Sequence, residues 1–326
     1  VPFEVNGSTG VYNAANGRKL TCYRDYALQV WDGATRAEYG IPTTEKEDDP
    51  SVSWKFTEGT LMPGKGYMVS TNNVPVLLFK ATSPADFHLA SQDTVLYYPY
   101  PSNLPNREAH SGWNFLAQSL TAAATLDFPV GTIVQRVKSA GQYDSEGVYE
   151  AVSWTATDVL APYACFFYQA NNVPGGELIY TATSEAATLR STRPAETTRY
   201  ELVVEHSEQP ALMDRMFWSF HAEATNAYEI TRDVMKMGVS DKALQLYAEA
   251  YGYPLAAIDA PITNHQVEIP FTVNLPAAGT YLLKALSLPT EEVLLYQKDQ
   301  LLCKLSEEDY PISVAQAGKM SYRLVV

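Results

Sequence analysis

Few residues of this chain fall at spacings that chemistry would require. The stretch 59–65 (Gly-Thr-Leu-Met-Pro-Gly-Lys) matches the first seven positions of a phosphate-binding loop. Such a loop continues with Ser or Thr and then with a helix whose N-terminus faces the phosphate. Here Gly66 stands at the eighth position, and the Tyr67-Met68-Val69 that follows consists of strand formers. We therefore predict a β-turn at this point and no nucleotide cofactor.

The histidines and the acidic clusters are interpreted as ordinary surface or structural residues. No two of the five histidines fall at the spacing of zinc ligands, and His-Glu-x-x-His and Gly-x-Ser-x-Gly are both absent. A triad assembled from distant residues stays open as an alternative, so a hydrolase is disfavoured and not excluded. The acidic clusters lack the glycine-bearing spacing of a calcium loop. No metal ion is expected. The residues concerned are His88, His110, His206, His221 and His265, and the acids Glu45, Glu47, Asp48, Asp49, Asp144 and Glu146.

Charge and cysteine content narrow the classes of partner. The formal charge is −14, from 23 basic and 37 acidic residues, and such a surface repels phosphate backbones and anionic lipid. Nucleic acid is therefore not an expected partner. Cys22, Cys165 and Cys303 lie far apart without a Cys-x-x-Cys motif, so neither a zinc site nor a disulfide framework is indicated. No apolar run approaches the ~20 residues of a membrane span, and no direct membrane insertion is expected.

The aromatic residues are better candidates for binding. The chain holds 22 tyrosines and 20 prolines, and Tyr-rich strands separated by Pro and Gly turns indicate an all-β protein. Tyr97, Tyr98 and Tyr100 lie in a proline-studded connector that cannot be a central strand, so at least one of them must face water. Exposed aromatic rings serve sugar or protein recognition. We take these three tyrosines as the candidate ligand-binding residues. The alternative is that they pack the two flanking segments together.

These flanking segments are related to each other. Three motifs recur in the same order 99 or 100 residues later: Ser53-Trp54, Pro63 and Asn72-Asn73-Val74-Pro75 return as Ser153-Trp154, Pro162 and Asn171-Asn172-Val173-Pro174. The match predicts two copies of one β-sandwich-like unit. Trp54 and Trp154 would be equivalent core residues, and Asp32-Gly33 is a hairpin-turn signal.

The remaining chain predicts a third domain. A Ser-, Thr-, Ala- and Pro-rich segment, 184–198, reads as a linker, and the chain beyond it alternates in short strands typical of a β-sandwich. We therefore expect a first copy over 1–110, a second over 111–194 and a C-terminal β-sandwich over 195–326. The second copy is small enough that the two copies could share one core. Residues 241–251 fit either a helix or a strand.

Several of these segments resemble a group of secreted, cell-surface proteins of gut Bacteroidetes, generally described as adhesins of unknown ligand and sometimes carrying leucine-rich repeats. The matching stretches are Pro2-Phe3-Glu4-Val5, Val30-Trp31-Asp32-Gly33 with Arg36-Ala37, Pro63-Gly64-Lys65-Gly66-Tyr67, Gly112-Trp113-Asn114-Phe115 and, near the C-terminus, Pro276-Ala277-Ala278-Gly279-Thr280-Tyr281. Ala117-Gln118-Ser119 departs from the Gly-Asn-Pro usual in that group. The resemblance implies that 241–251 is a strand hairpin.

The expected protein is thus all-β and non-enzymatic. The resemblance implies an extracellular or cell-surface location and a role in adhesion, with an extracellular glycan or protein as partner. The chain begins at Val1 and not at Met, so we expect a mature or trimmed fragment from which a signal segment has been removed. Two alternatives remain: a structural spacer or stalk module of a larger surface protein and, less favoured, a glycan-processing hydrolase.

Overall fold

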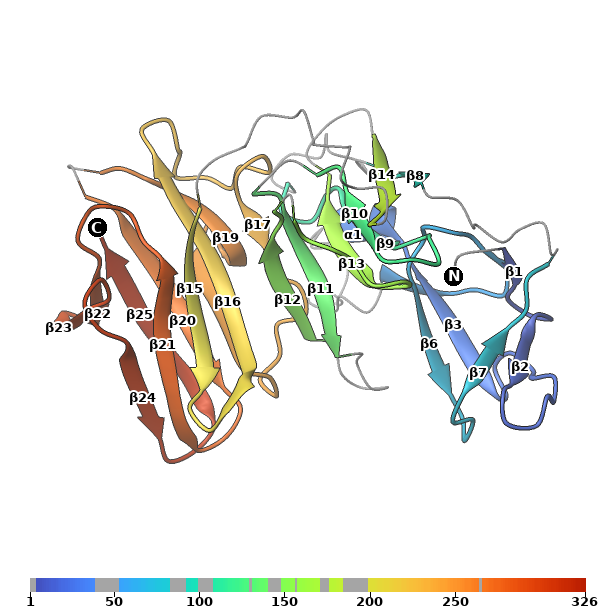
Figure 1. The fold of residues 1–326 in the computed structure, drawn as a ribbon. Coiled ribbons are helices and arrows are strands. Elements are labelled where there is room, and N and C mark those ends of the chain that lie inside the picture. The colour runs from blue at the N-terminus through green and yellow to red at the C-terminus, as the bar shows by residue number, and fades with distance from the viewer. Residues whose placement is uncertain are drawn as a thin grey trace. The chain divides into compact units, whose positions relative to one another are not determined.

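The computed structural model describes residues 4–38, 53–82, 92–98, 108–128, 131–139, 148–155, 157–170, 176–183, 199–263 and 266–326. The protein is nearly all β, with 55% of the described residues in strands and 2% in helix, and the predicted fold class is confirmed. Two compact units form (Figure 1): residues 1–130 with 154–194 make unit 1, and residues 131–153 with 195–326 make unit 2. The break after residue 194 falls where the linker is predicted. The segment 131–153, expected in the second copy, groups with the C-terminal unit.

Unit 1 is built from short strands and one short helix. The elements are β1 (Val5–Asn6), β2 (Val11–Asn13), β3 (Tyr26–Trp31), α1 (Gly33–Glu38), β4 (Trp54–Phe56), β5 (Thr60–Leu61), β6 (Tyr67–Thr71), β7 (Leu77–Phe79), β8 (Gln92–Leu96), β9 (Trp113–Ala117), β10 (Ala124–Leu126), β13 (Cys165–Gln169) and β14 (Glu177–Ala182). The strands pair in the orders β1-β5, β2-β7, β4-β3-β6 and β10-β14-β8, and β9 pairs with β13. Short strands separated by Pro and Gly turns were predicted, and the described part of unit 1 has this pattern.

The three-stranded sheet β4-β3-β6 has two different faces. Leu28 of β3 points into an apolar cluster with Val5, Val11 and Leu61. On the opposite face, Trp31 of β3 packs edge-on against Trp54. An aromatic core grows from this contact, since Trp54 also meets Phe115 of β9 and Phe167 of β13. Its members are Trp31, Trp54, Trp113, Phe115 and Phe167.

The predicted hairpin turn at Asp32-Gly33 is wrong, because a helix begins there. The Asp32 carboxylate accepts hydrogen bonds from the backbone N–H groups of Ala34 and Thr35, both at 3.1 Å, and from the Thr35 hydroxyl at 2.7 Å. Asp32 is therefore the N-cap of α1, satisfying amides that a helix start leaves unpaired. An Asp-Gly pair supports a hairpin turn as readily as a helix cap, and here the capping bonds decide.

Unit 2 is organised around one large sheet. Its elements are β11 (Ile133–Ser139), β12 (Val148–Ser153), β15 (Tyr200–His206), β16 (Gln209–His221), β17 (Val234–Met235), β18 (Gln245–Ala250), β19 (Tyr253–Pro261), β20 (Glu268–Leu275), β21 (Gly279–Ser287), β22 (Leu294–Gln297), β23 (Gln300–Lys304), β24 (Tyr310–Val314) and β25 (Gly318–Val325). The order is β23-β22-β25-β20-β18-β19-β16-β15-β21-β24, with β17 paired to β19. The sheet is nearly closed, consistent with a sandwich-like fold.

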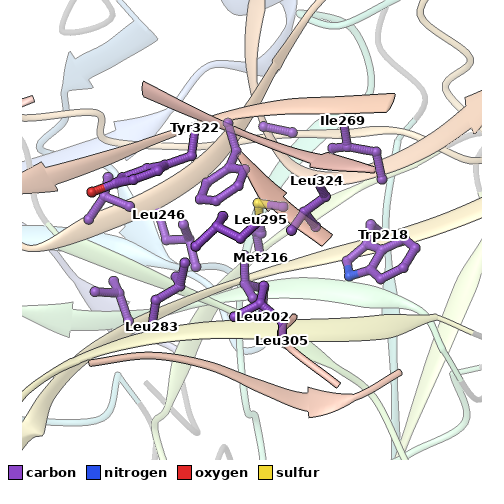
Figure 2. Packing of buried hydrophobic residues seen from close by; sticks show 14 of the residues in the cluster. Leu202, Met216, Trp218, Leu246, Ile269, Leu283, Leu295, Leu305, Tyr322 and Leu324 are labelled. Atoms are coloured by element: carbon purple, nitrogen blue, oxygen red, sulfur yellow. The ribbon is translucent and has the colours of Figure 1, made fainter. Parts of the chain in front are cut away.

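Side chains from both ends of that strand order meet in one core (Figure 2), and the sheet must therefore curl over itself. Trp218 of β16 and Tyr322 of β25 are members. The expected strand hairpin within 241–251 is confirmed: β18 and β19 pair across a turn at Tyr251-Gly252, whose φ values are 58° and 82°. Positive φ at both central residues is the geometry of a tight type I′ turn.

A hairpin from residues 131–153 completes unit 2. Ile133 of β11 and Ala151 of β12 pack on Phe217 of β16 and on neighbouring residues of β19. The buried Gln135 side chain donates to the Met235 carbonyl at 2.7 Å and accepts from the Met237 N–H at 2.8 Å. Apolar packing and these two buried hydrogen bonds together attach the hairpin to the C-terminal sheet.

Candidate functional site

The tyrosines predicted to bind ligand differ in how far the structure exposes their rings. Tyr97 is 9% exposed, and its ring meets that of Tyr168 edge-on at 5.2 Å. No free ring face is left for a ligand there, which matches the packing alternative. Tyr98 is 51% exposed, and its backbone is held by the Asn114 amide, which accepts from the Tyr98 N–H at 2.9 Å and donates to the Tyr98 carbonyl at 2.7 Å. Tyr100 lies outside the described residues.

A second exposed aromatic pair was not predicted. Phe56 of β4 is 62% exposed, and Tyr23, in the turn before β3, is 56% exposed. Their ring centroids are 5.8 Å apart at an interplanar angle of 77°, an edge-to-face contact. We call these two residues the Tyr23–Phe56 pair. Phe56 lies on the same sheet face as Trp54, because side chains two apart on a strand point the same way. Trp54 is covered by the aromatic core and Phe56 is not.

The backbone at Tyr23 is strained. Its φ is 62°, in the left-handed region, which costs a residue with a Cβ about 1–2 kcal/mol. Tyr251 is also left-handed, but its ring packs on the unit 2 core and its hydroxyl donates to the Thr225 carbonyl at 3.2 Å. Tyr23 gains no comparable burial. An exposed aromatic ring held in a strained turn is a reason to look for function at that position.

The turn that carries Tyr23 is tightly tied. The Asp25 carboxylate accepts from the Thr21 N–H at 2.8 Å and pairs with Arg18 and Arg24 at 3.1 and 3.0 Å. These bonds, from Arg18 first, hold the pKa of Asp25 well below its usual range. The Asn72 N–H donates to the Asp25 carbonyl at 2.9 Å. The ring of Tyr23 is therefore presented on a fixed backbone.

Polar groups adjoin the Tyr23–Phe56 pair. Gln29 of β3 lies directly across from Phe56 on one side and from Met68 of β6 on the other, so these three side chains share one sheet face. The carboxylate of Glu58 is close enough to add to partial burial in raising the pKa of Tyr23. The surface thus combines two aromatic rings with an amide and a carboxylate.

Unit 2 contains a histidine–carboxylate cluster at the ends of the parallel strands β16 and β19. The buried Asp259 accepts from Ser219 Oγ at 2.8 Å, and its Oδ1 lies 2.7 Å from Nδ1 of His221. Its second oxygen accepts from Arg232 at 3.0 Å. Burial raises the pKa of Asp259, but the bonds from His221, Ser219 and Arg232 outweigh it, and the pKa lies below its ordinary value.

The geometry of this cluster does not activate a nucleophile. In a catalytic triad the serine bonds to the histidine, which removes its proton. Here Ser219 and His221 both bond to the same carboxylate oxygen, so Ser219 has no base. Arg232 also pairs with Glu229, at 3.5 Å. The arrangement joins the loop before β17 to β19 and is interpreted as structural.

The turn at Pro63-Gly64, the cysteines and the acidic clusters were also considered from the sequence. The predicted turn at Pro63-Gly64 is confirmed, and strand β6 follows it instead of a helix. All three cysteines are free. The two acidic clusters at 45–49 and 144–146 lie outside the described residues. Over the described ranges, no group of His, Cys, Asp and Glu is arranged to hold a metal ion, and no helix is long and apolar enough to cross a membrane.

The fold and this surface define an all-β protein with an exposed aromatic pair. Comparisons of the chain with protein families, with curated proteins and with solved structures find no match. Inference about function therefore rests on the residues themselves.

Proposed function

We propose that this chain is a non-enzymatic, secreted or cell-surface protein that binds an extracellular glycan or protein through the exposed aromatic surface of unit 1. The observation that carries the proposal is the Tyr23–Phe56 pair, with both rings more than half exposed beside polar side chains. Solvent-exposed aromatic rings with adjacent hydrogen-bonding groups are typical of recognition surfaces. Tyr98 supplies a further exposed ring in the same unit.

The location and the duplication are parts of the same proposal. The resemblance to Bacteroidetes surface proteins supports an extracellular location and an adhesive role. An internal repeat is supported by the pairs β2-β7 and β10-β14, which hold similar places in the two expected copies. Gly64 and Tyr163, which lie 99 residues apart, both have positive φ, 75° and 65°. Superposition of 53–80 on 153–180 tests the repeat, and strands that follow different paths would contradict it.

Two alternatives predict different surfaces. A spacer or stalk module needs no exposed ring pair, whereas both rings of the Tyr23–Phe56 pair are more than half exposed. A glycan-processing hydrolase needs two opposed carboxylates, one to donate a proton and one to act as base or nucleophile. The buried carboxylates of Asp214 and Asp259 are instead bonded to Lys236 and to the His221 cluster.

The experiment is a binding screen of the full chain against a glycan array and a panel of extracellular matrix proteins. The proposal expects at least one specific ligand, with binding weakened in the variant Phe56→Thr, which keeps a strand former on an exposed position. Turnover of a glycan hit would favour the hydrolase. The absence of any ligand would favour the spacer.

A further inference from the structure

We propose that the Tyr23–Phe56 pair is a stacking site for a neutral pyranose ring of an extracellular glycan. The inference rests on the proposed binding function and narrows its ligand to one class.

The exposed area fits a small ligand. Two rings that are slightly more than half exposed offer about 200 Å² of aromatic surface, given the 150–250 Å² that each aromatic side chain can bury. A stable protein interface buries about 800 Å² on each partner. The sheet face beyond Phe56 continues into Gln29, a polar side chain, so the aromatic surface does not extend across the sheet. A single sugar ring matches this area and a protein does not.

The geometry matches the two kinds of surface on a sugar. One face of a pyranose carries C–H groups that pack on the electron-rich face of an aromatic ring, and its edge carries hydroxyls that need hydrogen-bond partners. The two rings meet at 77°, so a sugar stacked on one ring lies beside the other. Gln29 and Glu58 provide an amide and a carboxylate near the rings for the hydroxyls.

The charges select a neutral sugar. Glu58 follows Phe56 by two residues and is exposed, and its carboxylate would repel a sulfate, uronate or sialate. Lys55 points to the opposite face of β4, since alternate residues of a strand face opposite ways. Arg18 and Arg24 share the single carboxylate of Asp25, so these groups and Glu58 together sum to zero charge and offer an anionic sugar no net attraction. The net charge of −14 acts in the same direction.

The site is rigid before the ligand arrives. The bonds around Asp25 fix the turn that carries Tyr23, and Phe56 sits in a strand paired with β3. A preformed pair of rings loses little conformational entropy on binding. A small entropy cost is needed here because each exposed contact with a sugar contributes little free energy.

The test uses the full chain and an array that carries neutral, sialylated and sulfated forms of the same oligosaccharides. The strongest neutral hit is titrated by calorimetry against the unmodified chain and the variants Phe56→Thr and Tyr23→Gly. Glycine adopts the φ of Tyr23 without strain, so this variant should fold. Tyr163→Gly is the matched control, because Tyr163 is also an exposed tyrosine with φ 65°.

We expect neutral glycans to bind in preference to charged forms. Affinity should fall at least tenfold in Phe56→Thr and in Tyr23→Gly and stay unchanged in Tyr163→Gly, with all melting temperatures within about 4 °C of the unmodified chain. Equal binding by all variants would overturn the site. A chain that binds only matrix proteins or acidic glycans would overturn the inference and leave the proposed function standing. A chain that binds no ligand would overturn both.

Discussion

The buried carboxyl of Asp233 should make the stability of unit 2 depend on pH. Asp233 Oδ1 accepts from the Asp259 N–H and Oδ2 from the Glu229 N–H, both at 2.8 Å. Burial raises the pKa of Asp233 from its ordinary value of 3.8 to about 6, while these two bonds and the charge of Arg199 act in the opposite direction. The folded protein therefore holds this proton more tightly than the unfolded chain does.

The sign and size of this pH dependence follow from proton linkage. Because the folded pKa is the higher one, the stabilisation is fully present below about pH 4 and is lost as the pH rises through about 6. Between pH 4.5 and pH 7, a group with these two pKa values removes about 2 kcal/mol from the free energy of unfolding. Aspartates with lowered pKa values, such as Asp259, lose their own stabilisation only at lower pH.

The assay compares urea unfolding of the full chain with that of Asp233→Asn at pH 4.5 and pH 7. Asparagine has the same shape, does not titrate and can still accept one of the two backbone bonds. The difference in unfolding free energy between the two proteins should change by about 2 kcal/mol between these pH values, with the natural aspartate favoured at pH 4.5. A difference that is the same at both pH values would refute the reasoning.

Three further experiments test the packing and the buried polar groups. The substitution Trp154→Ala should lower the free energy of unfolding by about 3–5 kcal/mol, because Trp154 is only 1% exposed. Trp54→Ala should lower it by less, because Trp54 is only partly buried, and thermal melting of the two variants tests the difference. Lys236→Met leaves the buried Asp214 carboxylate without its cation and should cost about 3–5 kcal/mol in urea unfolding. Adding Asp214→Asn, which is uncharged and can still accept from the Leu246 N–H, should recover most of this loss, and no recovery would contradict the ion-pair account. Gln135→Ala should lower the free energy of unfolding by about 1–3 kcal/mol for each backbone group left unpaired, and it should speed hydrogen exchange at residues 234–237. Unchanged exchange would mean that Gln135 does not hold the hairpin.

Strand positions could be predicted where the side-chain alternation is strong. The region beyond residue 195 was predicted to form short alternating strands, and its described residues form β15 to β25. The segment 241–251 was ambiguous from propensity alone, and pairing of β18 with β19 and β20 fixes it as a strand. Tertiary pairing outweighs local helix propensity here.

The sequence does not predict that the 131–153 hairpin belongs to unit 2. The sequence of its strands is typical of any hairpin. Nothing in the sequence around Gln135 and Ile133 indicates that these residues contact another part of the chain, although Met235, which accepts from Gln135, lies 100 residues away. A polar glutamine in a strand ordinarily indicates a solvent-facing position. Only the carbonyl of Met235 and the amide of Met237 explain why it is buried.

The candidate site was missed for a similar reason. Trp54 and Phe56 alternate in one strand and share one sheet face, so the sequence predicts equal burial for both. The rings of Phe115 and Phe167 pack on Trp54, while Phe56, two residues further along the strand, is 62% exposed. Tyr97 shows the reverse: a proline-rich connector predicts exposure, and contact with Tyr168 buries the ring.

The central claim is that ligand binds at the Tyr23–Phe56 pair, and nuclear magnetic resonance of ring-labelled tyrosine and phenylalanine tests it most directly. Signals of Tyr23, Phe56, Tyr98 and Tyr163 would be assigned by single substitutions and followed as the best ligand of the binding screen is added. The account predicts that the ring signals of Tyr23 and Phe56 shift to saturation while those of Tyr163 stay in place. A ligand that shifts the signals of Tyr98 and leaves Tyr23 and Phe56 unmoved would contradict it.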